Sequence, residues 1–290
     1  MTPELHSFLG LTAGGFHRVV YREWLPEGGG RGNGRTVVCV HGLTRNGRDF
    51  DALAADLAGA GYRVICPDVV GRGDSDRLAD ARGYGYPQYL ADMAVLIARL
   101  DVKQVDWVGT SMGALIGMML GAQPKTPLRT LVLNDAGAVI PKAALERIAA
   151  YVGAEPVFED FAAAEQFART TYAGFGQLSD AQWRKLTEVT VLETGNGTYG
   201  LNYDPRIADA FKQAELNDVV LWPVWDAVSC PSLILRGAES DLLLDETAQE
   251  MTGRGPKAEL ATIADCAHAP ALMDADQIGI IRDWLDAKAP

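Results

Sequence analysis

The clearest chemical signal is a serine flanked by glycines, in the stretch Gly109-Thr110-Ser111-Met112-Gly113. It follows an apolar, β-like run and precedes a helix-like one. A sharp turn from strand to helix strains the middle residue, and small neighbours let the two elements pack closely. The serine hydroxyl then lies beside free N–H groups of the helix start, which favour a developing negative charge. We expect Ser111 to be a nucleophile; an incidental serine in a glycine-containing turn is the alternative.

A serine hydroxyl needs a base to remove its proton, and the chain has four histidines. His268 follows the last β-like run and precedes the closing helix, so its loop should open at the same sheet edge as Ser111. We expect His268 to be the base. His41 ends the first buried run and is expected to shape the neighbouring loop, whereas His6 and His17 are interpreted as structural or surface residues.

The base in turn needs a carboxylate that orients it. Asp241 follows the β-like run LILRG and lies between Ser111 and His268 in the chain, so we expect it to be the acid. Two alternatives stay open, Glu239 in the same turn and Asp135 at the end of the preceding run LVLND.

A tetrahedral oxyanion also needs hydrogen-bond donors. The backbone N–H of Met112 and that of Leu43, in the loop after TVVCV, are the expected donors. Arg45 is a candidate to meet a substrate carboxylate, although an ion pair is the alternative. Tyr199 and Tyr203 lie in a polar, glycine-rich stretch and are candidates to line the site's entrance, with packing inside the inserted segment as the alternative.

Short apolar runs alternate with helical patterns and predict the elements that position these residues. Uniformly apolar, β-branched runs are typical of strands buried on both faces of a parallel sheet. The runs are TVVCV, YRVICPD, VDWVG, LRTLVLND and CPSLILRG. Glycines near Ala13 indicate an N-terminal antiparallel hairpin. Open sheets of this kind bind ligands at the carboxyl edge of their strands.

The alternation stops at about residue 138 and resumes at about 225. Helical patterns fill the gap, and Ser179 followed by Gln182 marks one helix start. We therefore expect an α/β core made of residues 1–137 and 225–290, with a helical cap inserted over 138–224. The insertion follows a strand end, so it should lie over the site.

With these residues assembled, the chain resembles the α/β-hydrolase superfamily, in its branch of capped serine carboxylesterases and enol-lactonase-like enzymes. HGLTRNGRDF resembles the oxyanion loop, PDVVGRGDSDR a structural glycine-rich segment, and the order Ser111, Asp241, His268 is the order of the superfamily. Asp241 departs from the pattern because it lies four residues after Gly237 rather than three. Dehalogenases and epoxide hydrolases of this fold carry aspartate in place of Ser111. Carbon–carbon hydrolases usually follow the histidine with tryptophan, and here Ala269 follows it.

The resemblance implies a serine hydrolase that cleaves carboxylic esters through an acyl-enzyme. Short acyl or aryl esters, lactones and esters of hydroxyacid oligomers are the expected substrates. Carbon–carbon hydrolysis of ring-fission dienoates, or a non-enzymatic small-molecule receptor on the same fold, are the alternatives. No cofactor or metal is expected.

The composition narrows the partners and the compartment. A formal net charge of -12 argues against nucleic-acid binding, which needs a basic surface. None of the four cysteines forms a CxxC pair, and the N-terminus lacks the pattern of a signal peptide. No apolar run approaches the roughly 20 residues that span a bilayer. We expect a cytoplasmic protein without a membrane partner, and the sequence does not indicate its oligomeric state.

Overall fold

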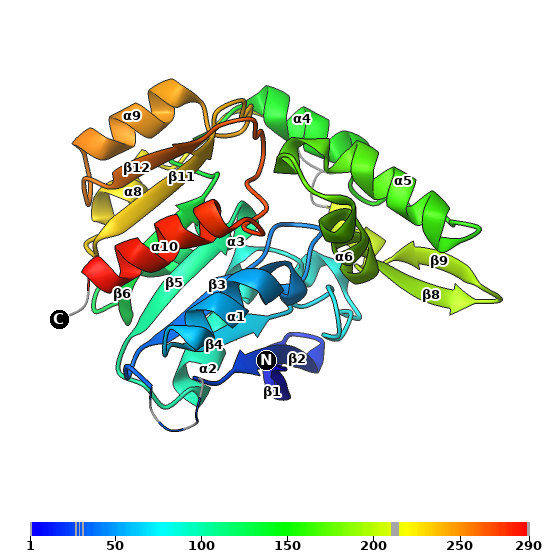
Figure 1. Cartoon of the computed structure of the whole chain (residues 1–290), viewed down its shortest axis with the longest axis horizontal. Helices are drawn as coiled ribbons and strands as arrows, with labels where there is room; N and C mark the ends of the chain where they lie inside the picture. The colour runs from blue at the N-terminus through cyan, green and yellow to red at the C-terminus, as the bar shows by residue number, and fades with distance from the viewer. Residues whose placement is uncertain (1, 27, 29, 31, 210–214, 289–290) are drawn as a thin grey trace.

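An eight-stranded sheet forms the centre of the computed structural model, which describes residues 2–26, 28, 30, 32–209 and 215–288 (Figure 1). The strand order is β1-β2-β4-β3-β5-β6-β11-β12. The strands are β1 (Glu4–Thr12), β2 (Gly15–Trp24), β3 (Thr36–Val40), β4 (Arg63–Pro67), β5 (Val105–Thr110), β6 (Leu128–Asn134), β11 (Ser232–Gly237) and β12 (Glu259–Ile263). The predicted mostly parallel α/β architecture is thereby confirmed.

The antiparallel part of the sheet is the N-terminal hairpin. Thr12 pairs with Gly15 across a tight turn, and β2 continues the sheet by pairing antiparallel with β4. Gly15 has a φ of 114°, which a residue without a Cβ adopts most readily. The strands from β4 to β12 run parallel, so the ends of β5, β6 and β11 lie next to one another at one edge.

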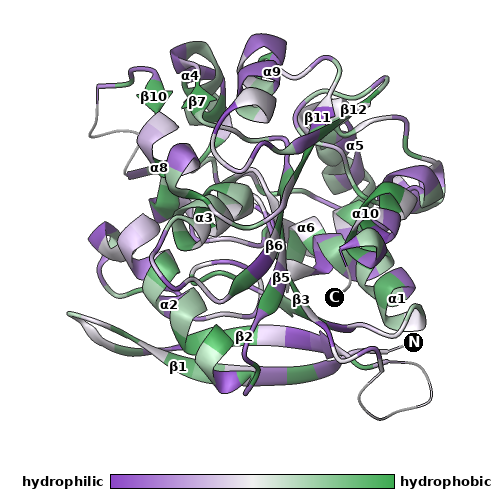
Figure 2. Cartoon of the chain, turned by 90° about the vertical axis from the view of Figure 1, so that its left-hand side faces the viewer, coloured by the Kyte–Doolittle hydropathy of each residue, from purple (hydrophilic) through white to green (hydrophobic). Residues whose placement is uncertain are grey.

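Helices cover both faces of the sheet because its central strands are apolar on both sides. All five residues of β3 are buried, and they alternate between two cores. Val37 and Cys39 pack on one face with α1 (Asp51–Gly59) and α10 (Ala275–Ala287). Val38 and Val40 pack on the other face. Figure 2 shows the sheet with helices on both of its faces.

The second layer consists of α2 (Tyr86–Arg99), α3 (Met112–Gly121), α8 (Trp222–Ala227) and α9 (Asp245–Gly253). The chain therefore forms three layers, helix–sheet–helix. Among the residues that the structure describes, no helix has the length and apolar character needed to cross a membrane.

The described part of the segment between β6 and α8 lies beyond the carboxyl ends of the strands (Figure 1). It contains α4 (Lys142–Tyr151), α5 (Phe161–Thr171) and α6 (Asp180–Thr190), and α6 begins with the expected capping box of Ser179 and Gln182. Besides the expected helices it holds a hairpin of β8 (Val191–Gly195) and β9 (Thr198–Leu201). The short strands β7 (Val139–Ile140) and β10 (Val219–Val220) pair antiparallel and bring the two ends of the segment together.

Candidate active site

Ser111 occupies the turn between β5, which ends at Thr110, and α3, which begins at Met112. Its backbone angles, φ 52° and ψ −113°, lie in a region that residues other than glycine rarely adopt. The flanking glycines make this turn possible. A Cβ on Gly109 would lie 2.3 Å from the Gly113 carbonyl carbon, and one on Gly113 would lie 1.9 Å from the Val40 carbonyl oxygen.

We expect Gly113→Ala to lower the free energy of unfolding by about 2–3 kcal/mol or more, because its Cβ meets backbone atoms of the central strand β3 that cannot turn aside. Gly253→Ala is the matched control: Gly253 also belongs to a helix, and a Cβ there meets nothing within 4 Å. Urea unfolding of both variants measures the difference. Equal stabilities would show that the turn does not need a glycine at position 113.

The side chain of His268 lies between Ser111 and Asp135. Its Nε2 is 2.9 Å from Ser111 Oγ, and its Nδ1 is 2.7 Å from Asp135 Oδ2. A carboxylate beside Nδ1 holds the proton on that nitrogen, so the lone pair of Nε2 faces the serine hydroxyl. Ser111, whose hydroxyl donates, thus begins a continuous hydrogen-bonded chain that ends on a carboxylate.

Asp135 follows β6 directly and is fully buried. Its Oδ1 accepts a hydrogen bond from the Gly237 N–H at 2.8 Å, and its Oδ2 accepts one from Ser240 Oγ at 2.6 Å. These donors stabilise the ionised carboxylate and fix its orientation toward His268. The turn after β11 therefore supports the acid without supplying it.

The expectation that Asp241 orients the histidine is wrong. Its carboxylate pairs with Arg147 on α4, with Nε–Oδ2 at 2.5 Å and Nη2–Oδ1 at 2.7 Å, and it is half-exposed. Glu239, the first alternative, is exposed as well. The second alternative, Asp135, occupies the position because β6 lies between β5 and β11 and so ends closest to Ser111. The chain order Ser–Asp–His is kept.

Another glycine lets the loop of His268 approach the sheet. A Cβ on Gly237 would lie 2.2 Å from the Ala267 carbonyl oxygen. The Ala267 N–H donates to the carbonyl of Gly174 at 2.8 Å, and Gly174 belongs to a 3₁₀ turn, Ala173–Phe175, of the inserted segment. The loop is thus held by the strand β11 on one side and by the inserted segment on the other.

The two predicted oxyanion donors lie beside Ser111. Neither the Leu43 N–H nor the Met112 N–H has a hydrogen-bond partner among the residues that the structure describes. Arg72, which sequence reasoning missed, connects them: its Nε donates to the Leu43 carbonyl at 2.9 Å, and its Nη2 lies 3.6 Å from the Met112 sulfur. Arg72 is buried, and its place between Gly71 and Gly73 was the only available signal.

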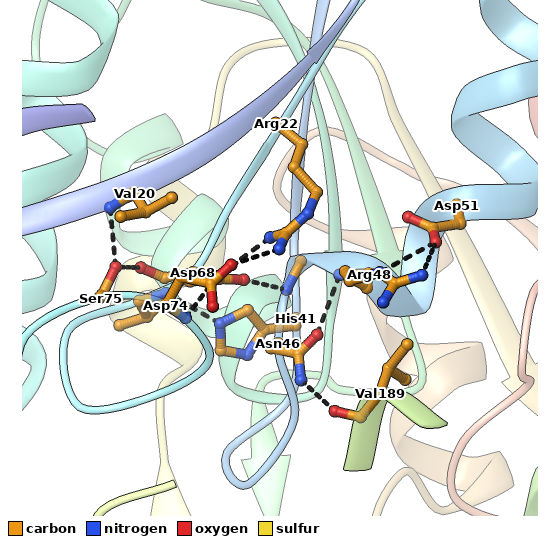
Figure 3. A network of polar contacts seen from close by, with 12 residues as sticks. Val20, Arg22, His41, Asn46, Arg48, Asp51, Asp68, Asp74, Ser75 and Val189 are labelled. Atoms are coloured by element: carbon orange, nitrogen blue, oxygen red, sulfur yellow. Dashed lines mark hydrogen bonds and ion pairs between the residues drawn. The ribbon is translucent and has the colours of Figure 1, made fainter. Parts of the chain in front are cut away.

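A buried polar network fixes the loop that carries Leu43 (Figure 3). Asp68 accepts hydrogen bonds from the Gly47 N–H at 2.7 Å and from Arg22 Nη1 at 3.1 Å. Burial raises the pKa of Asp68, and the charge of Arg22 opposes this rise. On the other side, Asn46 Nδ2 donates to the Val189 carbonyl of α6 at 2.6 Å. The backbone of this loop is therefore set before any ligand binds.

His41 belongs to the same network as a neutral imidazole. Its Nε2 accepts the Val69 N–H at 2.9 Å, and its Nδ1 lies 2.7 Å from the Gly42 carbonyl. Complete burial lowers the pKa of His41 from 6.5 to about 3. His41 therefore acts as a structural hydrogen-bond partner for the loop, as expected.

The lowered pKa of His41 predicts a loss of stability in acid. Between pH 6.5 and about 3 the unfolded chain binds a proton on His41 that the folded chain excludes, so stability falls as the pH falls. From about pH 6.5 to 4.5, the free energy of unfolding should drop by about 2 kcal/mol more in the wild type than in His41→Gln. Urea unfolding at both pH values measures this, and parallel losses would contradict it.

The site opens into a cavity that is partly open to solvent. Ser111, His268 and Leu43 line it, together with residues of α4, α5 and α6. Arg45 lines it too, but this arginine is buried and each of its nitrogens has a partner: Nε and Nη2 bind Asp49 at 2.9 and 2.6 Å, and Nη1 binds Thr190 at 2.5 Å. Arg45 thus joins the loop that carries Leu43 to α6, which favours the ion-pair alternative.

The structure places both tyrosines outside this cavity. Tyr199 pairs with Phe158 through two backbone hydrogen bonds of 2.9 Å. Tyr203 is buried, and its hydroxyl accepts the Gly153 N–H at 3.2 Å. Both tyrosines therefore stabilise the inserted segment, which agrees with the alternative that they pack inside it. Within the described parts of the chain, no group of three or more acidic, histidine or cysteine side chains is placed to hold a metal ion.

The fold and the site define a hydrolase of the α/β type, and the comparisons with known proteins agree. Residues 37–278 match the model of the alpha/beta hydrolase family, so the chain belongs to that family. A curated relative from Cupriavidus necator, a 3-hydroxybutyrate-oligomer hydrolase, is 45% identical over 96% of each chain. Two solved structures cover the whole chain and are themselves covered completely. One is a hydrolase from Rickettsia typhi (34% identity, TM-score 0.89), and the other an α/β hydrolase from Novosphingobium aromaticivorans (33%, 0.87).

Proposed function

We propose that this protein is a serine esterase that hydrolyses oligomers of 3-hydroxybutyrate or closely related hydroxyacids. The observation that carries the proposal is the hydrogen-bonded chain from Ser111 through His268 to Asp135, at the floor of a cavity. The Cupriavidus relative supports the substrate class, because its similarity extends over nearly the whole chain. Residues 138–224 serve in this proposal as a cap that encloses the cavity.

The first half of the reaction forms an acyl-enzyme. Ser111 Oγ attacks the ester carbonyl carbon while its proton passes to His268 Nε2. Asp135 stabilises the imidazolium that results, because its carboxylate faces the newly positive ring. The C–O bond to the alcohol then breaks, and His268 returns the proton to the leaving oxygen. The acyl group stays on Ser111 until a water, deprotonated by His268, cleaves it and regenerates the hydroxyl.

The oxyanion of each tetrahedral intermediate lies at the start of α3. We expect the N–H groups of Met112 and Leu43 to donate to it, because neither has a partner among the described residues. Arg72 contacts both residues. Removing one such donor typically raises the barrier by about 3 kcal/mol. Backbone donors are not removed by side-chain replacement, so the buried Arg72 is the residue through which this geometry can be perturbed.

The proposal is tested with the purified protein and the linear dimer of 3-hydroxybutyrate. We expect release of the monomer, measured by liquid chromatography. An alkyl fluorophosphonate should inactivate the enzyme and add its mass to the peptide that contains Ser111. A protein that binds the dimer without cleaving it, and whose Ser111 resists the phosphonate, would instead be a receptor.

A further inference from the structure

Arg147 on α4 brings a second positive charge to the wall of the catalytic cavity. Its side chain is 42% exposed, and Nε and Nη2 are both bound to Asp241, which does not itself line the cavity. Nη1 has no hydrogen-bond partner among the described residues. The aspartate thus holds the guanidinium from outside and leaves one edge of it free.

The free edge of Arg147 distinguishes it from Arg45, the other arginine of the cavity wall. Arg45 is buried and carries the bidentate carboxylate of Asp49, the hydroxyl of Thr190 and the ring of Tyr172, 4.7 Å from its guanidinium carbon. Nη1 of Arg147 therefore has no partner among the described residues, whereas each of the three guanidinium nitrogens of Arg45 has one. Ser111 and His268 line the same cavity as Arg147, which places its charge near the reacting groups.

The proposed substrates carry a carboxylate at a fixed place relative to the ester. In a linear hydroxyacid dimer the single carboxylate belongs to the alcohol half, a few bonds from the carbonyl that Ser111 attacks. The acyl half ends in an uncharged hydroxyl. A guanidinium in the cavity wall therefore discriminates between the two ends of the chain, and it does so on the leaving-group side.

Resting on the proposed function, we propose that Arg147 binds the free carboxylate of the leaving hydroxyacid and that Asp241 positions Arg147 for this role. The enzyme then removes units from the carboxyl end of an oligomer. A charge-assisted hydrogen bond at a half-exposed site predicts a preference of roughly 10- to 50-fold for the carboxylate over a neutral group of the same shape.

The test compares the 3-hydroxybutyrate dimer with its terminal carboxamide, which has the same shape and no charge. In the wild type, kcat/KM should be roughly 10- to 50-fold higher for the acid than for the amide. Arg147→Gln should bring this ratio close to one, mainly through KM of the acid, and Arg147→Lys should restore part of it. Lys142→Gln is the matched control, because Lys142 lies on the same helix, is half-exposed, pairs with Glu146 and does not line the cavity.

The direction of cleavage gives a second measurement. With a trimer whose carboxyl-terminal unit is isotopically labelled, the wild type should release labelled monomer first. Initial release of unlabelled monomer, or an acid-to-amide ratio that Arg147→Gln leaves unchanged, would overturn the role of Arg147. Both outcomes would leave the esterase intact, whereas an absence of Ser111-dependent cleavage of acid and amide alike would end the proposed function itself.

Discussion

Replacing Ser111 by alanine should lower kcat/KM for the 3-hydroxybutyrate dimer by at least about 10,000-fold. The hydroxyl is the atom that forms the acyl-enzyme, and no other described hydroxyl lies within hydrogen-bond distance of His268 Nε2. Alanine fits the strained turn as well as serine does, so the fold should be kept. Initial rates of monomer release measure the effect.

Ser7→Ala provides the control for Ser111→Ala. Ser7 is exposed on β1, far in the sheet order from β5, so its removal should leave the rate unchanged. Both variants should unfold at the wild-type urea concentration. A folded Ser111→Ala protein that keeps even a tenth of the wild-type rate would refute the serine mechanism.

Asp135→Asn should lower kcat by about 1,000- to 10,000-fold. The amide removes the negative charge that stabilises the imidazolium, and its NH₂ group favours the wrong tautomer of His268. Asparagine has the same shape as aspartate, so packing around the buried position should be unchanged. Its carbonyl oxygen can still accept the hydrogen bond from Gly237 or from Ser240. Steady-state kinetics with the neutral dimer amide isolate this effect from binding of the substrate carboxylate.

Asp241→Asn is the matched comparison, because it is the same chemical change in a residue that follows the neighbouring strand. Its carboxylate is half-exposed and contacts Arg147 rather than His268, so kcat for the amide should fall by less than about tenfold. A larger loss in Asp241→Asn than in Asp135→Asn would mean that the histidine turns toward β11 during the reaction.

The sequence was sufficient for the parts of the site that depend on local chain geometry. The turn at Ser111 requires small residues at fixed offsets, and Gly109 and Gly113 satisfy this requirement within five consecutive residues. The uniformly apolar strands predict a sheet buried on both faces. His268 could be placed because it is the histidine that follows the last strand.

The acid could not be chosen in the same way. Asp135 and Asp241 both lie between Ser111 and His268 in the chain. Each follows an apolar strand, and these two strands, β6 and β11, are parallel neighbours in the sheet. The deciding facts are contacts between distant segments: Ser240 and the Gly237 N–H support one carboxylate, and Arg147 captures the other. Sequence spacing contains neither of these contacts.

The residues that line the cavity could not be predicted for a related reason. A glycine-rich, polar stretch gives no sign of which helix its tyrosines will pack against, and Tyr203 is buried beside Gly153 rather than exposed to the cavity. Arg147 could not be predicted as a cavity residue because an arginine on an amphipathic helix is usually solvated. Its importance follows only from the place of α4 above the site.

The bonds between the oxyanion loop and α6 affect how the enzyme can adapt to different substrates. Arg45 binds Thr190 and Asn46 binds the Val189 carbonyl, so any shift of the end of α6 pulls on the loop that presents the Leu43 N–H. An acyl chain that pushes α6 aside should react slowly even when it binds tightly. Displacing α4 leaves these two bonds intact and acts instead on the Arg147–Asp241 pair, so a longer chain on that side should alter binding of the leaving group before it alters the oxyanion loop.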